Sequence, residues 1–170
     1  ETNNGWTQLI SILAARPPAD LAVDNLSVTG PAATGRPLSV QWTIRDDGTA
    51  STVPTSWTDR VYLSRDGILD SQDVLLASVV RTGALTNGGA YDVTTSPVIP
   101  SLVAAGQYRI LIQADALDQV TEPAAEANNL AVSDPIEVTV GADLTVASVQ
   151  SPGIARGSER IDVTWVVRNV

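Results

Sequence analysis

The stretch GQYRILIQA, residues 106–114, decides the class of fold. Tyr108, Ile110 and Ile112 stand at every second position, which is the period of a β-strand with one buried face. Short segments with the same alternation lie on both sides of it, separated by turns rich in Gly, Pro, Asp and Asn. No segment sustains the 3.6-residue period of an amphipathic helix. The sequence therefore predicts an all-β chain.

Six further segments carry this alternation and are expected to be strands. They lie at residues 21–28, 38–44, 57–64, 73–81, 91–95 and 130–140. About seven short strands in a domain of ordinary size are typical of an immunoglobulin-like antiparallel β-sandwich. The alternation slips near Asp24 and Asn25, which indicates a β-bulge. Tyr108, near the start of the penultimate strand, suits a tyrosine corner.

The sequence repeats itself at an offset of 123 residues. Residues 19–23 (ADLAV) recur as residues 142–146 (ADLTV), and residues 126–129 (EANN) have a counterpart at residues 1–4 (ETNN) at an offset of 125, a difference that fits a change of loop length between copies. Alternating apolar positions recur at the same offset of 123: Leu38, Val40, Trp42 and Ile44 correspond to Ile161, Val163, Trp165 and Val167.

These recurrences predict three parts of the chain. Residues 1–16 are expected to be the last strand of a preceding repeat, residues 17–140 a complete repeat, and residues 141–170 the first two strands of a following repeat. A period of this length favours separate domains in a row, because each unit can bury its own core. Trp42 and its counterpart Trp165 are expected in such cores.

Composition excludes several classes of function. The net charge is −9, and the chain has no His, no Cys and no Lys. An acidic chain without a basic cluster is unsuited to nucleic acid or to an anionic membrane surface, and no apolar run is long enough for membrane insertion. The missing residue types remove imidazole acid–base catalysis, thiol nucleophiles and Schiff bases. We therefore predict that the protein is not an enzyme.

Two acidic segments are candidate Ca²⁺ sites. One is the turn at residues 66–73, and the other is the long loop at residues 115–129. Ca²⁺ takes six to eight oxygen ligands in loosely fixed geometry, although neither spacing is that of an EF-hand. The alternatives are a solvated turn for the first segment and a loop ordered by its own side chains for the second. The candidate ligands are Asp66, Asp70, Asp73, Asp115, Asp118, Glu122 and Glu126.

Three aromatic residues give a second candidate site. Trp57, Tyr62 and Tyr91 could together form an exposed platform on which a sugar ring stacks. The alternative is that they pack across strands on the face of a sheet. On the same strand as Trp57 and Tyr62, Asp59 could pair with Arg109 or Arg45 across the sheet; an exposed pair contributes little, so we interpret Asp59 as structural.

Four stretches together resemble a known bacterial family. They are ADL (19–21), SWTDRVYLSRD (56–66), GQY (106–108), and the ending that runs from Asp115 through VTE (120–122) to EANN (126–129). In combination they resemble the CARDB domain, the cell adhesion related domain found in bacteria, over nearly all of residues 19–140. The resemblance implies an immunoglobulin-like sandwich in large, repetitive, secreted or surface-anchored proteins, where it serves adhesion or spacing. It brings no catalytic residues.

We therefore expect a non-catalytic structural or adhesive spacer repeat, stiffened by Ca²⁺, outside the cell or at a bacterial cell surface. Its expected partners are adjacent repeats and a surface protein or polysaccharide. The alternative is an accessory module that binds carbohydrate or another ligand for a secreted enzyme or adhesin. The boundary VGAD at residues 140–143 leaves almost no linker. The alternating end segments, 5–16 and 141–170, should pair with each other, with the intact domain or with another molecule as a strand-complemented oligomer.

Overall fold

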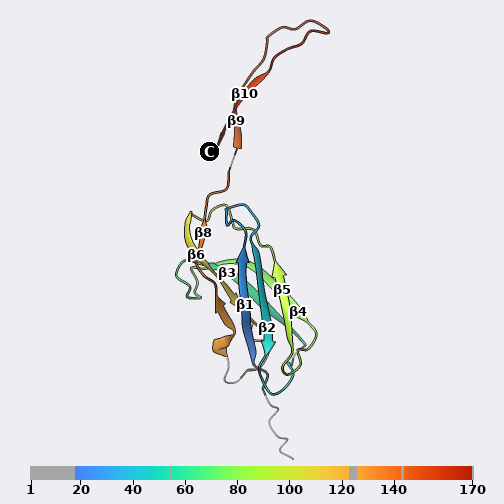
Figure 1. The fold of residues 1–170 in the computed structure, drawn as a ribbon, viewed down its shortest axis with the longest axis vertical. Coiled ribbons are helices and arrows are strands. Elements are labelled where there is room, and N and C mark those ends of the chain that lie inside the picture. Colours follow the sequence, from blue (N-terminus) through green and yellow to red (C-terminus); the bar gives the residue numbers. More distant parts are fainter. Residues whose placement is uncertain (1–17, 54, 123–125, 143, 170) are drawn as a thin grey trace, which may run out of the picture.

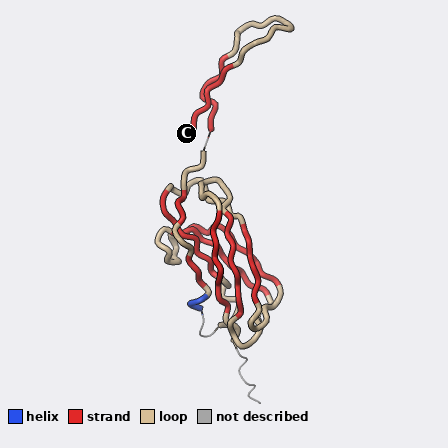
Figure 2. The backbone as a smooth tube through the Cα atoms, viewed as in Figure 1, coloured by secondary structure: helices blue, strands red, loops and turns tan. Residues whose placement is uncertain are grey.

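The computed structural model describes residues 18–53, 55–122, 126–142 and 144–169, so the predicted strand at residues 1–16 lies outside the described part. Within that part the chain is built from strands, with one short turn of 3₁₀ helix, η1 (Glu126–Asn128) (Figure 2). No helix there has the length and apolar character needed to cross a membrane. The strands are β1 (Leu21–Thr29), β2 (Ser39–Asp46), β3 (Ser56–Ser64), β4 (Val74–Thr82), β5 (Ala90–Thr95), β6 (Gly106–Gln113), β7 (Leu130–Val132), β8 (Ile136–Val138), β9 (Leu144–Gln150) and β10 (Thr164–Asn169).

Strands β1 to β8 form two antiparallel sheets that face each other (Figure 1). One sheet has the order β1-β2-β5, and the other has the order β4-β3-β6-β7, with β8 also paired to β6. This arrangement confirms the predicted immunoglobulin-like sandwich. Strands β9 and β10 pair only with each other in the sheet order and extend beyond one end of the sandwich (Figure 1).

The core lies between the sheets and is filled by the alternating residues of both. Its largest side chains are two tryptophans, Trp42 from β2 and Trp57 from β3, each at most 1% exposed. They supply the aromatic bulk because the chain contains no Phe and no Met. Burying one large aliphatic side chain contributes about 1.5–3 kcal/mol relative to leaving it exposed. The aliphatic residues buried with them include Leu21, Leu38, Val40, Ile44, Val61, Leu63, Ile99, Ile110 and Ile112.

Two local predictions are confirmed. The register of β1 against β2 shifts between Asp24 and Ser27, and Asn25 has a φ of +52°, so a bulge interrupts the strand at the predicted place. The hydroxyl of Tyr108 donates a hydrogen bond to the carbonyl oxygen of Ala104 at 3.0 Å, which is the tyrosine corner.

The closing strand differs from the prediction of one strand at residues 130–140. It is divided into β7 and β8, and Pro135 lies in the gap. Proline cannot donate to a ladder, so continuous pairing ends there. The hydroxyl of Ser133 instead accepts a hydrogen bond from the Ile110 N–H at 2.9 Å. After Pro135 the chain pairs with β6 again, as β8.

Candidate functional site

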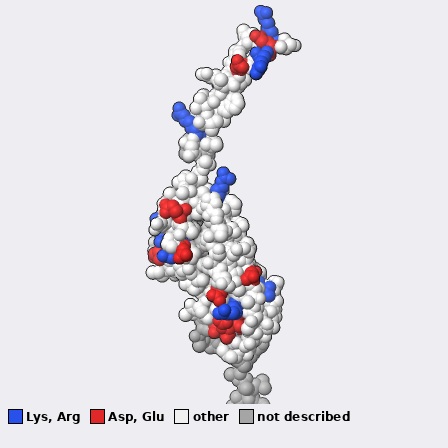
Figure 3. All heavy atoms as spheres, viewed as in Figure 1, with Lys and Arg blue, Asp and Glu red and all other residues white. Residues whose placement is uncertain are grey.

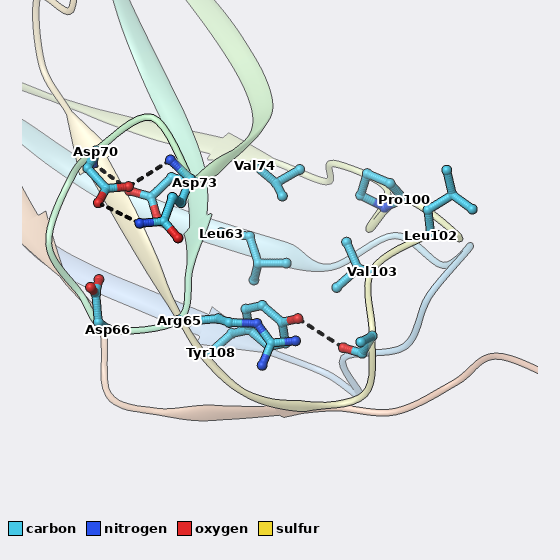
Figure 4. A pocket seen from close by; sticks show the side chains of 12 residues that line it. Leu63, Arg65, Asp66, Asp70, Asp73, Val74, Pro100, Leu102, Val103 and Tyr108 are labelled. Carbon is cyan, nitrogen blue, oxygen red and sulfur yellow. Dashed lines mark hydrogen bonds between the residues drawn. The ribbon is translucent and has the colours of Figure 1, made fainter.

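A cavity of about 520 Å³ opens between the loop after β3 and the loop before β6 (Figure 4). Leu102 on its rim is 96% exposed, and the guanidinium carbon of Arg65 lies 4.8 Å from the centre of the Tyr108 ring. The cavity is lined by apolar side chains and, at its rim, by three aspartates. Its lining residues are Leu63, Arg65, Asp66, Asp70, Gln72, Asp73, Val74, Pro100, Leu102, Val103, Ala104 and Tyr108.

The three rim carboxylates are the first predicted Ca²⁺ group, and each accepts a hydrogen bond from the backbone of its own loop. Asp66 accepts from the Ile68 N–H at 2.9 Å, and Asp70 accepts from the Gln72 N–H at 2.7 Å. Asp73 accepts from the N–H of Asp70 at 3.0 Å. Such bonds are those by which Asp residues fix turns. These bonds order the turn that carries the three carboxylates.

The second predicted Ca²⁺ group also holds backbone in place. Asp115 accepts hydrogen bonds from the N–H groups of Gln119 and Val120, at 2.9 and 2.6 Å. Burial raises the pKa of the Asp115 carboxyl, and these two bonds oppose the rise. Asp118 is exposed, with a φ of +52°, while Glu126 begins η1 and its side chain lies outside the described part.

Glu122 joins this loop to the first strand. It is 3% exposed, and its two carboxylate oxygens accept from the backbone N–H of Leu21 at 2.7 Å and from the side-chain amide of Asn129 at 2.6 Å. The neighbouring Asn128 donates to the carboxylate of Asp20 at 2.7 Å. The EANN element that recurs in the sequence therefore fixes the start of the sandwich to its last loop.

The acidic side chains of the described part do not converge on one point. Among them no group of three acidic residues lies close enough to hold a metal ion. Ca²⁺ requires six to eight oxygens around one point, whereas the carboxylates above serve separate backbone groups. Calcium binding stays a prediction, and the function proposed below does not depend on it.

The three aromatic residues do not share an exposed face. Trp57 points into the core, and Tyr62 lies at the opposite phase of the same strand. Tyr91, from the facing sheet, packs against Trp57 with ring centres 6.1 Å apart, and the guanidinium carbon of Arg81 lies 4.4 Å from the centre of the Tyr91 ring. Trp57 and Tyr91 therefore pack between the two sheets, which differs both from an exposed sugar platform and from packing across strands on one sheet face.

Asp59 is buried, so it does not form the exposed ion pair considered with Arg109 or Arg45. Its side chain is 1% exposed and accepts hydrogen bonds from the Tyr91 hydroxyl and from the Asp115 N–H, both at 3.1 Å. It thereby ties the two sheets and the acidic loop together. Burial raises the pKa of Asp59 to about 6, although both hydrogen bonds favour the charged form.

This raised pKa predicts a specific pH dependence of stability. The folded state holds the proton of Asp59 up to about pH 6, whereas the unfolded chain releases it near pH 4. Proton binding by Asp59 therefore adds on the order of 2–3 kcal/mol to the free energy of unfolding below pH 4, and this contribution is lost as pH rises towards 6. In urea unfolding at several pH values, the free energy of unfolding of Asp59→Asn should fall less between pH 4 and 6 than that of the native chain. The fall that remains in the variant should come from Asp115, whose pKa is also raised. An unchanged fall in the variant would refute this role of Asp59.

A cluster of backbone bonds, here called the C-terminal clamp, holds the chain where it leaves the sandwich. The N–H of Thr139 donates to the Ala32 carbonyl at 3.0 Å, and the N–H of Thr34 donates to the Thr139 carbonyl at 2.9 Å. The N–H of Gly141 donates to the Thr34 hydroxyl at 2.9 Å. A Cβ on Gly141 would lie 2.3 Å from the Thr34 carbonyl oxygen, so this approach requires glycine. Sequence reasoning missed Thr34, which no local pattern marks.

A second cluster, the N-terminal clamp, holds the chain where it enters. The N–H of Thr49 donates to the Pro18 carbonyl at 3.1 Å, and the N–H of Asp47 donates to the Asp20 carbonyl at 2.7 Å. A Cβ on Gly48 would lie 2.6 Å from the Pro18 carbonyl oxygen. This clamp lies where β1 begins, at the opposite end of the sandwich from the β9–β10 hairpin (Figure 1).

The β9–β10 hairpin has the same register as β1–β2 at both ends, although Val166 pairs with Ser148 where its counterpart Thr43 pairs with Asp24. Leu144 pairs with Asn169 as Leu21 pairs with Asp46, and Gln150 pairs with Thr164 as Ser27 pairs with Gln41, each at the offset of 123 residues. Both hairpins insert one extra residue in the first strand between these pairs.

The two hairpins differ in burial. Every residue of β9 and β10 is exposed, and Trp165 is 63% exposed where its counterpart Trp42 is 1% exposed. Figure 3 shows the stem of the β9–β10 hairpin as largely uncharged, with charged atoms gathered mostly at its tip. The hairpin thus presents apolar residues of the kind that β1 and β2 bury.

Comparison with known proteins identifies the family. Residues 18–133 match the CARDB family. The chain belongs to this family. The match ends before β8, so the β9–β10 hairpin lies beyond the matched part of the CARDB domain. No curated protein matches the chain in sequence.

Solved CARDB domains share the fold. The crystal structure of a CARDB domain from Pyrococcus furiosus, described as a complex with di-metal ions, is 19% identical with a TM-score of 0.53, over 75% of this chain and 100% of its own. A solution structure of the same domain is 22% identical with a TM-score of 0.52, over 73% and 98%. CARDB domains are modules of a non-enzymatic type. At these identities the likeness establishes the fold alone.

Proposed function

We propose that this CARDB domain is a non-catalytic structural spacer, one unit of a row of similar sandwiches joined end to end. The observation that carries the proposal is the β9–β10 hairpin, which repeats β1–β2 at one sequence offset, pairs corresponding residues at both ends, and has one extra residue in its first strand. Two unrelated hairpins have no physical reason to share all three. The hairpin is accordingly the beginning of a second sandwich.

The energetics of the hairpin support the same proposal. An isolated two-stranded hairpin is marginally stable in water. Leu144, Val146 and Trp165 are each at least 60% exposed, and burying side chains of this size would contribute roughly 1.5–3 kcal/mol each. In the described sandwich the corresponding face of β1–β2 is covered by the facing sheet of β3 and β6. The second sandwich needs the equivalent strands.

We place this repeat outside the cell or at a bacterial cell surface, with adjacent repeats as its main partners and a surface protein or polysaccharide as the target of the whole array. The acidic net charge and the resemblance of the sequence to the bacterial adhesion-related family support this setting. The ligand-binding alternative loses its three named residues, because Trp57 is buried and Tyr62 lies at the opposite phase of β3.

Removing the hairpin tests the proposal. A chain that ends after Ala142 should melt at the same temperature as the full chain, because the hairpin belongs to a different domain. It should also be monomeric in light scattering, whereas the full chain should self-associate through its exposed apolar strands as concentration rises. A melting temperature several degrees lower in the shortened chain would mean that the hairpin is part of the first sandwich.

Calcium is tested separately. If Ca²⁺ stiffens the repeat, millimolar CaCl₂ should raise the melting temperature and EDTA should lower it, and the same melting temperature in both would remove Ca²⁺ from the proposal. A rise in Ca²⁺ that is lost in Asp70→Asn would establish the first predicted site. A rise that is lost in Asp118→Asn would establish the second.

A further inference from the structure

The two clamps form hydrogen bonds to different backbone groups of two residues that correspond in the repeat. The N-terminal clamp holds the carbonyl of Pro18, and the C-terminal clamp holds the N–H of Gly141. Pro18 and Gly141 are separated by the same 123 positions that relate the two hairpins. Each residue therefore occupies the same place at the start of its repeat. Pro18 is hydrogen-bonded through its carbonyl, and Gly141 through its N–H.

We propose that Gly141 is shared by two consecutive repeats. Its N–H is held by Thr34 of the first repeat, and its carbonyl accepts a hydrogen bond from the residue that corresponds to Thr49 in the second. This inference rests on the proposed function, because it requires a second sandwich. It leaves no free residue between the two domains to act as a hinge.

The shared residue defines an interface between the domains. The N and O atoms of a single residue lie roughly 3–4 Å apart. The turn that contains Thr34 and the next repeat's counterpart of the Asp46–Thr49 turn must then contact each other across Gly141. The partner surface is thus the N-terminal end of another copy, and glycine is required at the contact because a Cβ would strike the Thr34 carbonyl.

The row gains stiffness from this contact without metal ions or covalent crosslinks. The clamp is specific to the boundary at Gly141. At the preceding boundary the corresponding residue is Pro18, which has no N–H to donate. The two boundaries of the same repeat are therefore expected to differ in stiffness.

The test uses the full chain extended by its own sequence. Residues 48–140 are fused after Val170, which completes the second copy because residue 170 corresponds to residue 47. The chain has no cysteine, so spin labels can be attached at Ser78→Cys on exposed β4 and at the corresponding position of the completed copy. The distance distribution between the labels, measured by pulsed electron paramagnetic resonance, should be narrow. Inserting Gly-Ser after Gly141 should broaden it about twofold.

A matched pair of variants separates the clamp from general effects on folding. Thr34→Val keeps the shape of the side chain but removes the acceptor for the Gly141 N–H, and it should broaden the distribution in the same direction. Thr94→Val, on the exposed face of β5, should leave the distribution unchanged. If Trp165 is buried but the distance distributions of the extended chain and its Gly-Ser variant are equally broad, the sharing of Gly141 is refuted while the proposed second sandwich stands. Trp165 exposed in the extended chain would overturn the proposed function as well.

Discussion

Replacing Glu122 with alanine should lower the free energy of unfolding by about 3 kcal/mol. The substitution leaves the N–H of Leu21 and the side-chain amide of Asn129 without the buried carboxylate that accepts from both. Each buried donor left without an acceptor costs about 1–3 kcal/mol. The loss should appear in urea unfolding as a lower midpoint with an unchanged slope.

Two variants make the Glu122 result specific. Glu122→Gln retains one acceptor oxygen but turns an NH₂ group towards a donor, so its loss of stability should be intermediate. Glu137→Ala, at an exposed position of β8, should change stability by no more than about 0.5 kcal/mol. If Glu122→Ala were as mild as Glu137→Ala, the loop would not anchor the first strand.

Replacing Trp42 with alanine should cost about 3–5 kcal/mol, whereas Trp165→Ala in the same chain should cost almost nothing. The two residues correspond in the repeat and differ in exposure, 1% against 63%. Removing a fully buried ring leaves a cavity in the core, whereas an exposed ring is already in contact with water and its removal leaves no cavity. Calorimetry of the two variants measures the contrast directly.

Since a loss of this size can unfold a small domain, Trp42→Phe serves as the milder test of the core. It should give a folded protein of reduced stability. A large and equal loss from Trp165→Ala would mean that the hairpin is packed against the first sandwich, in conflict with the separate-domain account.

The sequence predicts the strands well where one buried face imposes alternation. Tyr108, Ile110 and Ile112 mark β6 because every second side chain must enter the core. The bulge near Asn25 is visible for the same reason, as a change of phase. The division of the closing strand at Pro135 follows from a residue that is plain in the sequence, yet the apolar alternation around it favours one continuous strand.

The buried polar contacts are harder to predict. Asp59 shares the phase of Trp57 and Val61, which indicates a buried position, but its charge favours the surface. The conflict is resolved by the Tyr91 hydroxyl and the Asp115 N–H, which only the folded chain brings near. The Thr34–Gly141 bond spans 107 positions and leaves no local pattern. The same holds for Glu122 and Leu21, 101 positions apart.

The candidate metal and sugar residues show the limit of composition as a guide. Carboxylates close in sequence form a cation site only if their oxygens converge, and spacing alone does not determine this; what the fold adds is the backbone N–H groups from which Asp70, Asp73 and Asp115 accept. Aromatic residues indicate a platform only if they share a face. Strand phase already separates Trp57 from Tyr62, so this part of the outcome could have been read from the sequence.

Exchange of the Trp165 indole proton in the extended chain, followed by NMR, tests the central claim most directly. If residues 144–169 begin a second sandwich, this proton should exchange rapidly in the chain of 170 residues and become as protected as that of Trp42 once the second copy is complete. The indole proton of Trp42 in the same chain provides the control, since Trp42 is 1% exposed and its proton should be equally protected in both chains. A Trp165 proton that stays unprotected in the correctly joined chain would contradict the account.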